Sequence, residues 1–118
     1  MQLEERLVGS IVIVAVKGDI TLNKGSDVVL RDKVRSLIQQ GHLQLLIDLG
    51  QVSYVDSAGL GELVQAYATT KNKGGSLKLL GLTKRLKDLL AITKLATVFE
   101  SFDQEADAIA SFSTPARP

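Results

Sequence analysis

The chain has 118 residues, the length of one ordinary domain, and 45% of them are hydrophobic, which is enough for an aliphatic core. The absence of cysteine excludes disulfide frameworks, thiolate zinc sites and cysteine nucleophiles, and makes the cytoplasm the expected compartment. A net charge of +1 lacks the basic excess typical of nucleic-acid binding. The longest aliphatic run, Ile11 to Val16, has strand length and is too short to span a membrane.

The first half of the chain predicts two strands, a helix and a third strand. Leu3–Val8 and Ile11–Val16 are expected to be strands joined by a hairpin turn at Gly9-Ser10. A helix is predicted from Ser26 to Gly41, because its apolar residues recur with helical spacing: Val29 or Leu30, Val34, Leu37 and Ile38. Leu45–Leu49 is apolar on both faces, which predicts a central strand.

The middle of the chain continues with a loop, a second helix and a further strand. The loop spans residues 50–56, and Gly74-Gly75 is expected to end the helix that follows it. The inner stripe of that helix, or its edge, is predicted to comprise Leu60, Leu63, Val64, Tyr67 and Lys71. Ser76–Leu80 is predicted to be the next strand.

The last third predicts two more helices around a short strand. Thr83 is expected to cap a helix whose apolar residues are Leu86, Leu89 and Leu90. Thr97–Phe99 is expected to be a short final strand, and Ser101 and Gln104 have capping-box spacing before a helix with an apolar face formed by Ala106, Ile109 and Phe112. Residues 113–118 are predicted to be a flexible tail.

The order of these elements predicts the fold class. Two strands followed by alternating helices and strands are typical of an α/β domain with a mixed, mostly parallel sheet. We expect a single domain over residues 1–112, with about four to six strands covered by about four helices.

The most informative segment is the start of the second helix. Ser57 is predicted to be its N-cap, and the small residues Ala58, Gly59 and Gly61 are expected to leave its backbone open to a partner surface. The alternative is purely structural: a capped helix whose glycines allow tight packing on the sheet. A nucleophile elbow is excluded because position 55, where it requires glycine, is Val55. No phosphate-binding loop, metal-ligand cluster or cofactor motif is found.

Several stretches in their order along the chain resemble a STAS domain. They are Gly18-Asp19-Ile20, the strand Leu46-Ile-Asp-Leu49, the segment Val55-Asp-Ser-Ala-Gly-Leu-Gly61, and Gly74-Gly75 before the next strand. The resemblance covers about residues 3–112 and is strongest to the bacterial anti-sigma factor antagonists. It implies a non-enzymatic protein that binds an anti-sigma factor, through a surface expected to include Asp19, Thr21, Asp56, Ser57, Ala58, Gly59 and Leu60.

The resemblance also implies a switch centred on Ser57. In that family the anti-sigma factor is itself a serine kinase, phosphorylation of the serine abolishes binding, and a metal-dependent phosphatase restores it. One departure concerns Thr21, where many members carry an acidic residue two positions after the acidic one matched by Asp19. Thr21 is therefore a second candidate phosphorylation site.

A different class of function stays open. STAS-like domains also regulate membrane transport systems, so a cytoplasmic regulatory subunit of a transporter is the alternative to sigma-factor control. The basic cluster Lys84, Arg85 and Lys87 lies early in its helix, where positive charge is unfavourable, and is a candidate contact surface.

Overall fold

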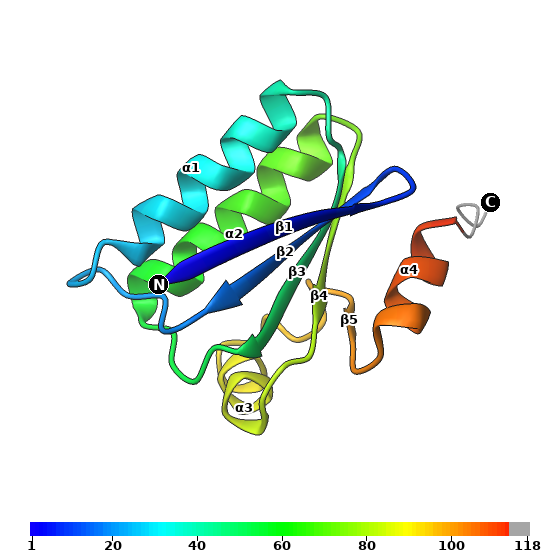
Figure 1. Cartoon of the computed structure of the whole chain (residues 1–118). Helices are drawn as coiled ribbons and strands as arrows, with labels where there is room; N and C mark the ends of the chain where they lie inside the picture. Colours follow the sequence, from blue (N-terminus) through cyan, green and yellow to red (C-terminus); the bar gives the residue numbers. More distant parts are fainter. Residues whose placement is uncertain (114–118) are drawn as a thin grey trace.

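The computed structural model describes residues 1–113 as a sheet with helices on both faces (Figure 1). The strands are β1 (Gln2–Val8), β2 (Ile11–Lys17), β3 (Gln44–Gln51), β4 (Ser76–Leu80) and β5 (Ser101–Phe102). The helices are α1 (Ser26–Gln39), α2 (Ser57–Asn72), α3 (Lys84–Ile92) and α4 (Glu105–Ser113). Within the described residues, no helix has both the length and the apolar character needed to cross a bilayer.

The sheet has five strands in the spatial order β1-β2-β3-β4-β5. β1 is antiparallel to β2 and joined to it by the predicted hairpin, with Val8 opposite Ile11, whereas β2 to β5 are parallel to one another. The expected single α/β domain with a mixed, mostly parallel sheet is therefore confirmed.

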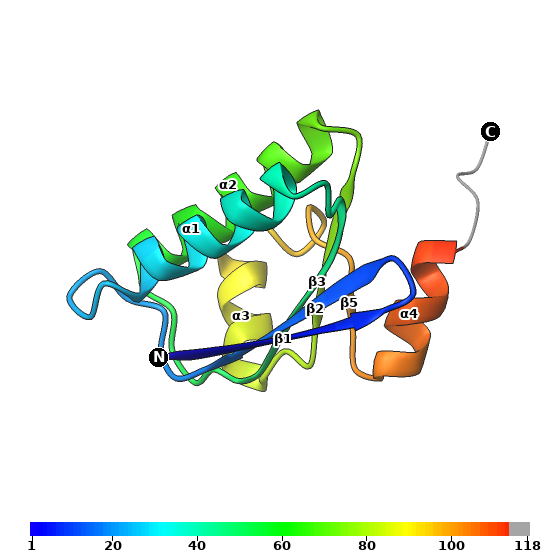
Figure 2. The same ribbon diagram turned by 45° about the horizontal axis from the view of Figure 1, so that its top comes forward.

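The strand order explains which face each helix covers. Each parallel strand is added on the same side of the previous one, and right-handed crossovers then place all the connecting helices on one face. Residues of α1, α2 and α3 accordingly share one core with the sheet, including Leu30, Leu63 and Leu86. α4 follows the last strand and packs on the opposite face, around Ala108 (Figure 2).

Two predictions about the segment after α3 are wrong. Thr97–Phe99 is not a strand; it lies in turns that place the Phe99 ring in the core, edge-on to Tyr67 with ring centroids 5.4 Å apart. Ser101 does not cap α4, because it lies in β5, where it pairs with Leu79 of β4. The apolar residues of this segment thus reflect burial of a turn rather than strand formation.

The faces of α2 and α4 also differ in part from the prediction. In α4 the fully buried residue is Ala108, and Ala106 is exposed, whereas Ile109 and Phe112 pack on the second core as expected. In α2 Leu63 is buried, its predicted apolar neighbours are half-buried, and Lys71 is exposed. Of the predicted tail, Ser113 is the last residue of α4 and residues 114–118 lie outside the described residues.

Candidate functional site

The sequence-predicted residues gather at one edge of the sheet. The loops after β2 and β3 both lie at the carboxyl ends of parallel strands, next to the first turns of α1 and α2 (Figure 1). Hydrogen bonds join the loops: the Ile20 amide donates to the Tyr54 carbonyl (3.1 Å), and the Asp56 amide donates to the Ile20 carbonyl (3.2 Å). The two loops thus form one continuous surface.

Asp56, rather than Ser57, is the N-cap of α2, so the capping prediction is wrong by one residue. Its backbone is extended, and one carboxylate oxygen accepts the Gly59 amide at 2.8 Å while the other accepts the Leu22 amide at 2.9 Å. These bonds, that from Leu22 first and that from Gly59 next, hold the pKa of Asp56 below its ordinary value of 3.8. Asp56 therefore carries a negative charge at neutral pH. Its hydrogen bonds fix the loop after β2, called the first loop below, to the start of α2.

Because Asp56 takes the capping role, the Ser57 side chain is released from it. Ser57 is the first helical residue of α2 and is exposed, and among the described residues its hydroxyl has no hydrogen-bond partner. Ala58 and Leu60 beside it are half-buried, and Leu60 packs against the main core. A small, accessible hydroxyl therefore lies at the N-terminus of α2, and it makes no hydrogen bond within residues 1–113.

Gly59 is occupied inside the protein rather than at a partner surface. It is buried, and a Cβ placed on it would overlap the Ile20 carbonyl oxygen and lie 2.9 Å from the Ile20 Cγ2 atom. The close approach of the first loop accounts for this glycine. The expectation that its backbone is open therefore does not describe Gly59, although Gly61 is exposed.

The predicted residues of the first loop differ in their accessibility. Asp19 keeps 29% of its side chain exposed; it accepts a hydrogen bond from the Ser53 hydroxyl at 3.0 Å and lies 3.8 Å from the Lys24 ammonium. Thr21 is only 6% exposed, and within residues 1–113 its buried hydroxyl has no hydrogen-bond partner. Thr21 thus belongs to the loop that contributes to the site, but its side chain is buried.

Two exposed apolar side chains at this edge were missed by the sequence reading. Leu22 is 65% exposed and Tyr54 is 47% exposed, one in each of the two joined loops. The sequence indicates them only in that each loop contains an apolar residue that belongs to no predicted helix or strand. Both side chains belong to loops that are hydrogen-bonded to each other and to the cap of α2.

Potential metal ligands are scattered at this edge and elsewhere in residues 1–113. No group of three or more histidine, cysteine or acidic side chains is placed to hold an ion there. The site therefore offers an exposed hydroxyl, a neighbouring carboxylate and two apolar side chains.

The fold is shared with several solved structures. An anti-sigma factor antagonist from Mycobacterium paratuberculosis has a TM-score of 0.84 at 18% identity, over 96% of this chain and 94% of that one. The anti-sigma factor antagonist SpoIIAA, solved in unphosphorylated and phosphorylated forms, has a TM-score of 0.72 in each at 18% identity, over 93% of this chain and 96% or 98% of those. The murine anion transporter Slc26a9 has a TM-score of 0.72 at 17% identity, over 90% of this chain but 18% of the transporter.

Sequence comparison identifies the protein family more specifically than the similarity of folds does. The anti-sigma-B factor antagonist of Bacillus subtilis is 40% identical over 90 residues, which are 71% of this chain and 82% of that protein. Residues 2–108 match the STAS domain family. This chain therefore belongs to the STAS domain family and is similar to its anti-sigma factor antagonists.

Proposed function

We propose that this protein is an anti-sigma factor antagonist that works in the cytoplasm and whose partner binding is switched off by phosphorylation of Ser57. The observation that carries the proposal is the free, exposed Ser57 hydroxyl on the first residue of α2. Unphosphorylated, the protein binds a kinase-type anti-sigma factor and so releases the sigma factor. A protein phosphatase returns the modified protein to the binding form.

The electrostatics of the helix start support a switch without refolding. A phosphate on Ser57 adds about −1.5 to −2 charges at neutral pH, and the free N–H groups and dipole at a helix N-terminus favour such a charge. It lies next to the ionised Asp56 carboxylate, so the surface becomes strongly negative. A partner that fits the small unmodified surface is then repelled, and a loss of about 4 kcal/mol weakens binding about a thousandfold.

Accessibility favours Ser57 over Thr21 as the modified residue. A kinase must bring its phosphate donor to the hydroxyl oxygen, and the Thr21 hydroxyl is buried whereas Ser57 is exposed. Modifying Thr21 first requires opening the loop that Leu22 and Asp56 hold closed by a 2.9 Å hydrogen bond. We therefore assign the control point to Ser57 alone.

The surrounding loops supply the contact area of the proposed partner site. Leu22 and Tyr54 are the exposed apolar side chains of the two loops, and the partly exposed Asp19 adds a carboxylate in the loop that contains Leu22. Truncating an aromatic anchor near the centre of an interface commonly costs more than about 1 kcal/mol. Tyr54→Ala is therefore expected to weaken partner binding about tenfold.

The direct test uses candidate kinase-type anti-sigma factors from the same organism. The purified protein is incubated with each candidate, ATP and magnesium, and the phosphate is located by mass spectrometry. Ser57→Ala serves as the control for the site, and Ser57→Asp is compared with the unmodified protein for partner affinity. We expect phosphate on Ser57 only, and about thousandfold weaker binding after its transfer.

Two results would contradict this proposal. Phosphate on Thr21 in the Ser57→Ala protein would place the control point in the first loop. Full partner affinity of the phosphorylated protein would show that modification does not control binding. The regulatory-subunit alternative is less favoured, because the 40% identical relative is an anti-sigma-B factor antagonist and the likeness to Slc26a9 concerns the fold alone.

A further inference from the structure

The two glycines at the start of α2 differ in what the protein requires of them. Gly59 is needed because the Ile20 carbonyl fills the space where a side chain would lie. Gly61 is exposed and helical, and apart from its chain neighbours and the backbone of its own helix no atom lies within 4 Å of a Cβ placed on it. Glycine inside a helix is less stable than alanine, so its presence at position 61 has no explanation within the described chain.

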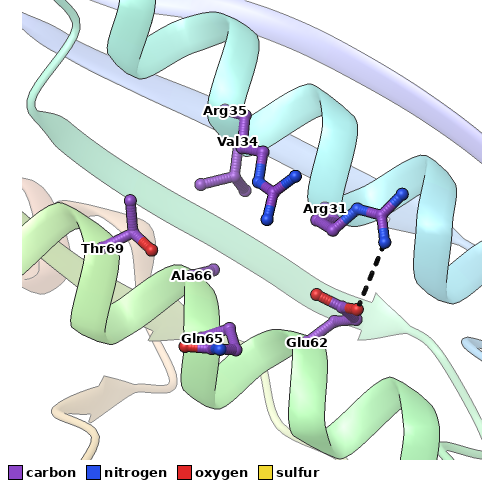
Figure 3. A pocket seen from close by; sticks show the side chains of 7 residues that line it. All are labelled: Arg31, Val34, Arg35, Glu62, Gln65, Ala66 and Thr69. Atoms are coloured by element: carbon purple, nitrogen blue, oxygen red, sulfur yellow. Dashed lines mark ion pairs between the residues drawn. The ribbon is translucent and has the colours of Figure 1, made fainter.

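Gly61 belongs to a row of residues that leads away from Ser57. Ser57, Gly61, Gln65 and Thr69 are spaced by four residues, so they form one ridge along the surface of α2. The far end of this ridge borders a small cavity between α1 and α2, lined by Arg31, Val34, Arg35, Glu62, Gln65, Ala66 and Thr69 (Figure 3). Because position 61 has no side chain, the surface of α2 is lower there, between Ser57 and the residues that border the cavity.

The cavity carries more positive than negative charge. Arg31 and Arg35 extend from α1 toward α2, and the Arg31 guanidinium lies 4.0 Å from the Glu62 carboxylate (Figure 3). Within residues 1–113, Arg35 has no hydrogen bond or ion pair, and the side chains of Gln65 and Thr69 have no hydrogen-bond partner. Arg35 and Gln65 are exposed, so both can reach a ligand, and because the guanidinium is charged and only donates hydrogen bonds, the ligand that complements it best is a negatively charged acceptor.

The size of the cavity limits what enters it. Its volume is about 50 Å³, whereas sites for drug-sized ligands and cofactors are several hundred Å³. The volume suits a group of a few atoms, such as a carboxylate, and excludes a nucleotide. A partner covering about 800 Å² around Ser57 also extends well beyond the first turn of α2.

We infer that the anti-sigma partner continues from Ser57 across Gly61 and places the carboxylate of an aspartate or glutamate side chain against Arg35 in the α1–α2 cavity. This inference rests on the function proposed above and extends its binding site by a second contact. The bidentate geometry of an arginine–carboxylate pair adds orientation to the contact. The partner is thereby held at a second point, away from the residue that is phosphorylated.

The test measures partner affinity and phosphorylation kinetics for Arg35→Glu. The matched control is Lys94→Glu, which replaces a positive by a negative charge at an exposed position after α3 and outside the cluster of Lys84, Arg85 and Lys87. We expect Arg35→Glu to weaken binding about tenfold to a hundredfold and to raise the KM for phosphorylation of Ser57 with kcat unchanged, whereas Lys94→Glu has little effect. Gly61→Gln, which fills this lower part of the surface with a neutral side chain, is expected to weaken binding similarly while the protein stays folded.

The outcomes separate this inference from the proposed function. If the wild-type protein is bound and phosphorylated normally but Arg35→Glu behaves like wild type, only the second contact is wrong. Equal losses in Arg35→Glu and Lys94→Glu would indicate a general charge effect and overturn it as well. Inorganic phosphate binding that depends on Arg35, with unchanged partner affinity, would assign the cavity to a free anion. Failure of the wild type to bind any candidate kinase would overturn the proposed function and the second contact together.

Discussion

Two serines occupy the same position in two neighbouring helices, and their surroundings differ. Ser26 is the first residue of α1 and Ser57 the first residue of α2, both at the carboxyl edge of the sheet. Ser26 is 2% exposed; its hydroxyl accepts the Thr21 amide at 2.7 Å and donates to the Asp19 carbonyl at 2.8 Å. Ser57 is exposed and, within residues 1–113, its hydroxyl makes no hydrogen bond.

The difference follows from the way each helix is capped. α1 begins after Gly25, which is in a left-handed conformation and offers no side-chain cap, so Ser26 turns inward and binds the loop. α2 begins after Asp56, whose carboxylate accepts both the Gly59 amide and the Leu22 amide. One serine therefore stabilises the edge of the sheet, and the other is left available for chemistry on the surface.

The largest expected effect comes from separating α2 from the first loop. In Gly59→Ala the new Cβ overlaps the Ile20 carbonyl, so either the loop or the helix start must move. We expect a loss of about 3 kcal/mol in the free energy of unfolding, measured by urea denaturation.

Gly61→Ala is the matched control for that substitution. It adds the same methyl group two residues later, where no atom beyond the chain neighbours and the backbone of α2 lies within 4 Å. Its expected effect is a gain of about 1 kcal/mol from helix propensity. Destabilisation of both variants by the same amount would show that the contact with Ile20 is not the cause.

The next effect tests the two serines directly. Ser26→Ala leaves the Thr21 amide and the Asp19 carbonyl without their partner in a buried setting, which is expected to cost about 2 kcal/mol. Ser57→Ala removes no hydrogen bond and is expected to change stability by less than about 0.5 kcal/mol. Thermal unfolding of the two variants under one buffer measures both. Equal losses would mean that Ser57 has a structural role.

Much of this arrangement is predictable from the chain, because local signals agree with the fold. The hairpin at Gly9-Ser10, the end of α1 before Gly41 and the Thr83 cap of α3 all follow from turn and capping chemistry, and each is confirmed. The sequence also predicts that Ser57 lies at the start of α2. It does not show which residue is the N-cap, because aspartate and serine are equally good N-caps and are adjacent in the sequence.

The contacts that decide which residues of the site are exposed were not predictable, because they join loops about thirty residues apart in the sequence. The Leu22–Asp56 hydrogen bond and the close approach of the Ile20 carbonyl to Gly59 depend on β2 and β3 being neighbours. For the same reason, Thr21 resembled an open candidate in sequence although the fold buries it. A short apolar stretch such as Thr97–Phe99 likewise does not distinguish a buried turn from a strand.

A smaller effect is expected from the charge of the α2 cap. Hydrogen bonds from the Leu22 and Gly59 amides lower the pKa of Asp56, so its ionised form stabilises the folded state. That contribution is complete above the ordinary pKa of 3.8 and is lost as the pH falls through the lower folded-state value. Asp56→Asn is therefore expected to lower the melting temperature at pH 7, and the difference from wild type is expected to shrink below about pH 4. A constant difference at all pH values would assign the effect to shape rather than charge.

A comparably small change in stability is expected for Ser57→Asp, and it separates binding from folding. An acidic side chain in the first turn of α2 interacts favourably with the helix dipole, which is worth about 0.5 kcal/mol at a surface position. The variant is therefore expected to unfold at the same temperature as wild type or slightly higher, although its partner affinity falls. The same charge at position 26 would be buried among backbone groups already hydrogen-bonded to the serine, so Ser26→Asp is expected to destabilise the protein strongly. If Ser57→Asp also destabilised the fold, its loss of binding would reflect unfolding, and the start of α2 would resemble that of α1 more closely than its exposure indicates.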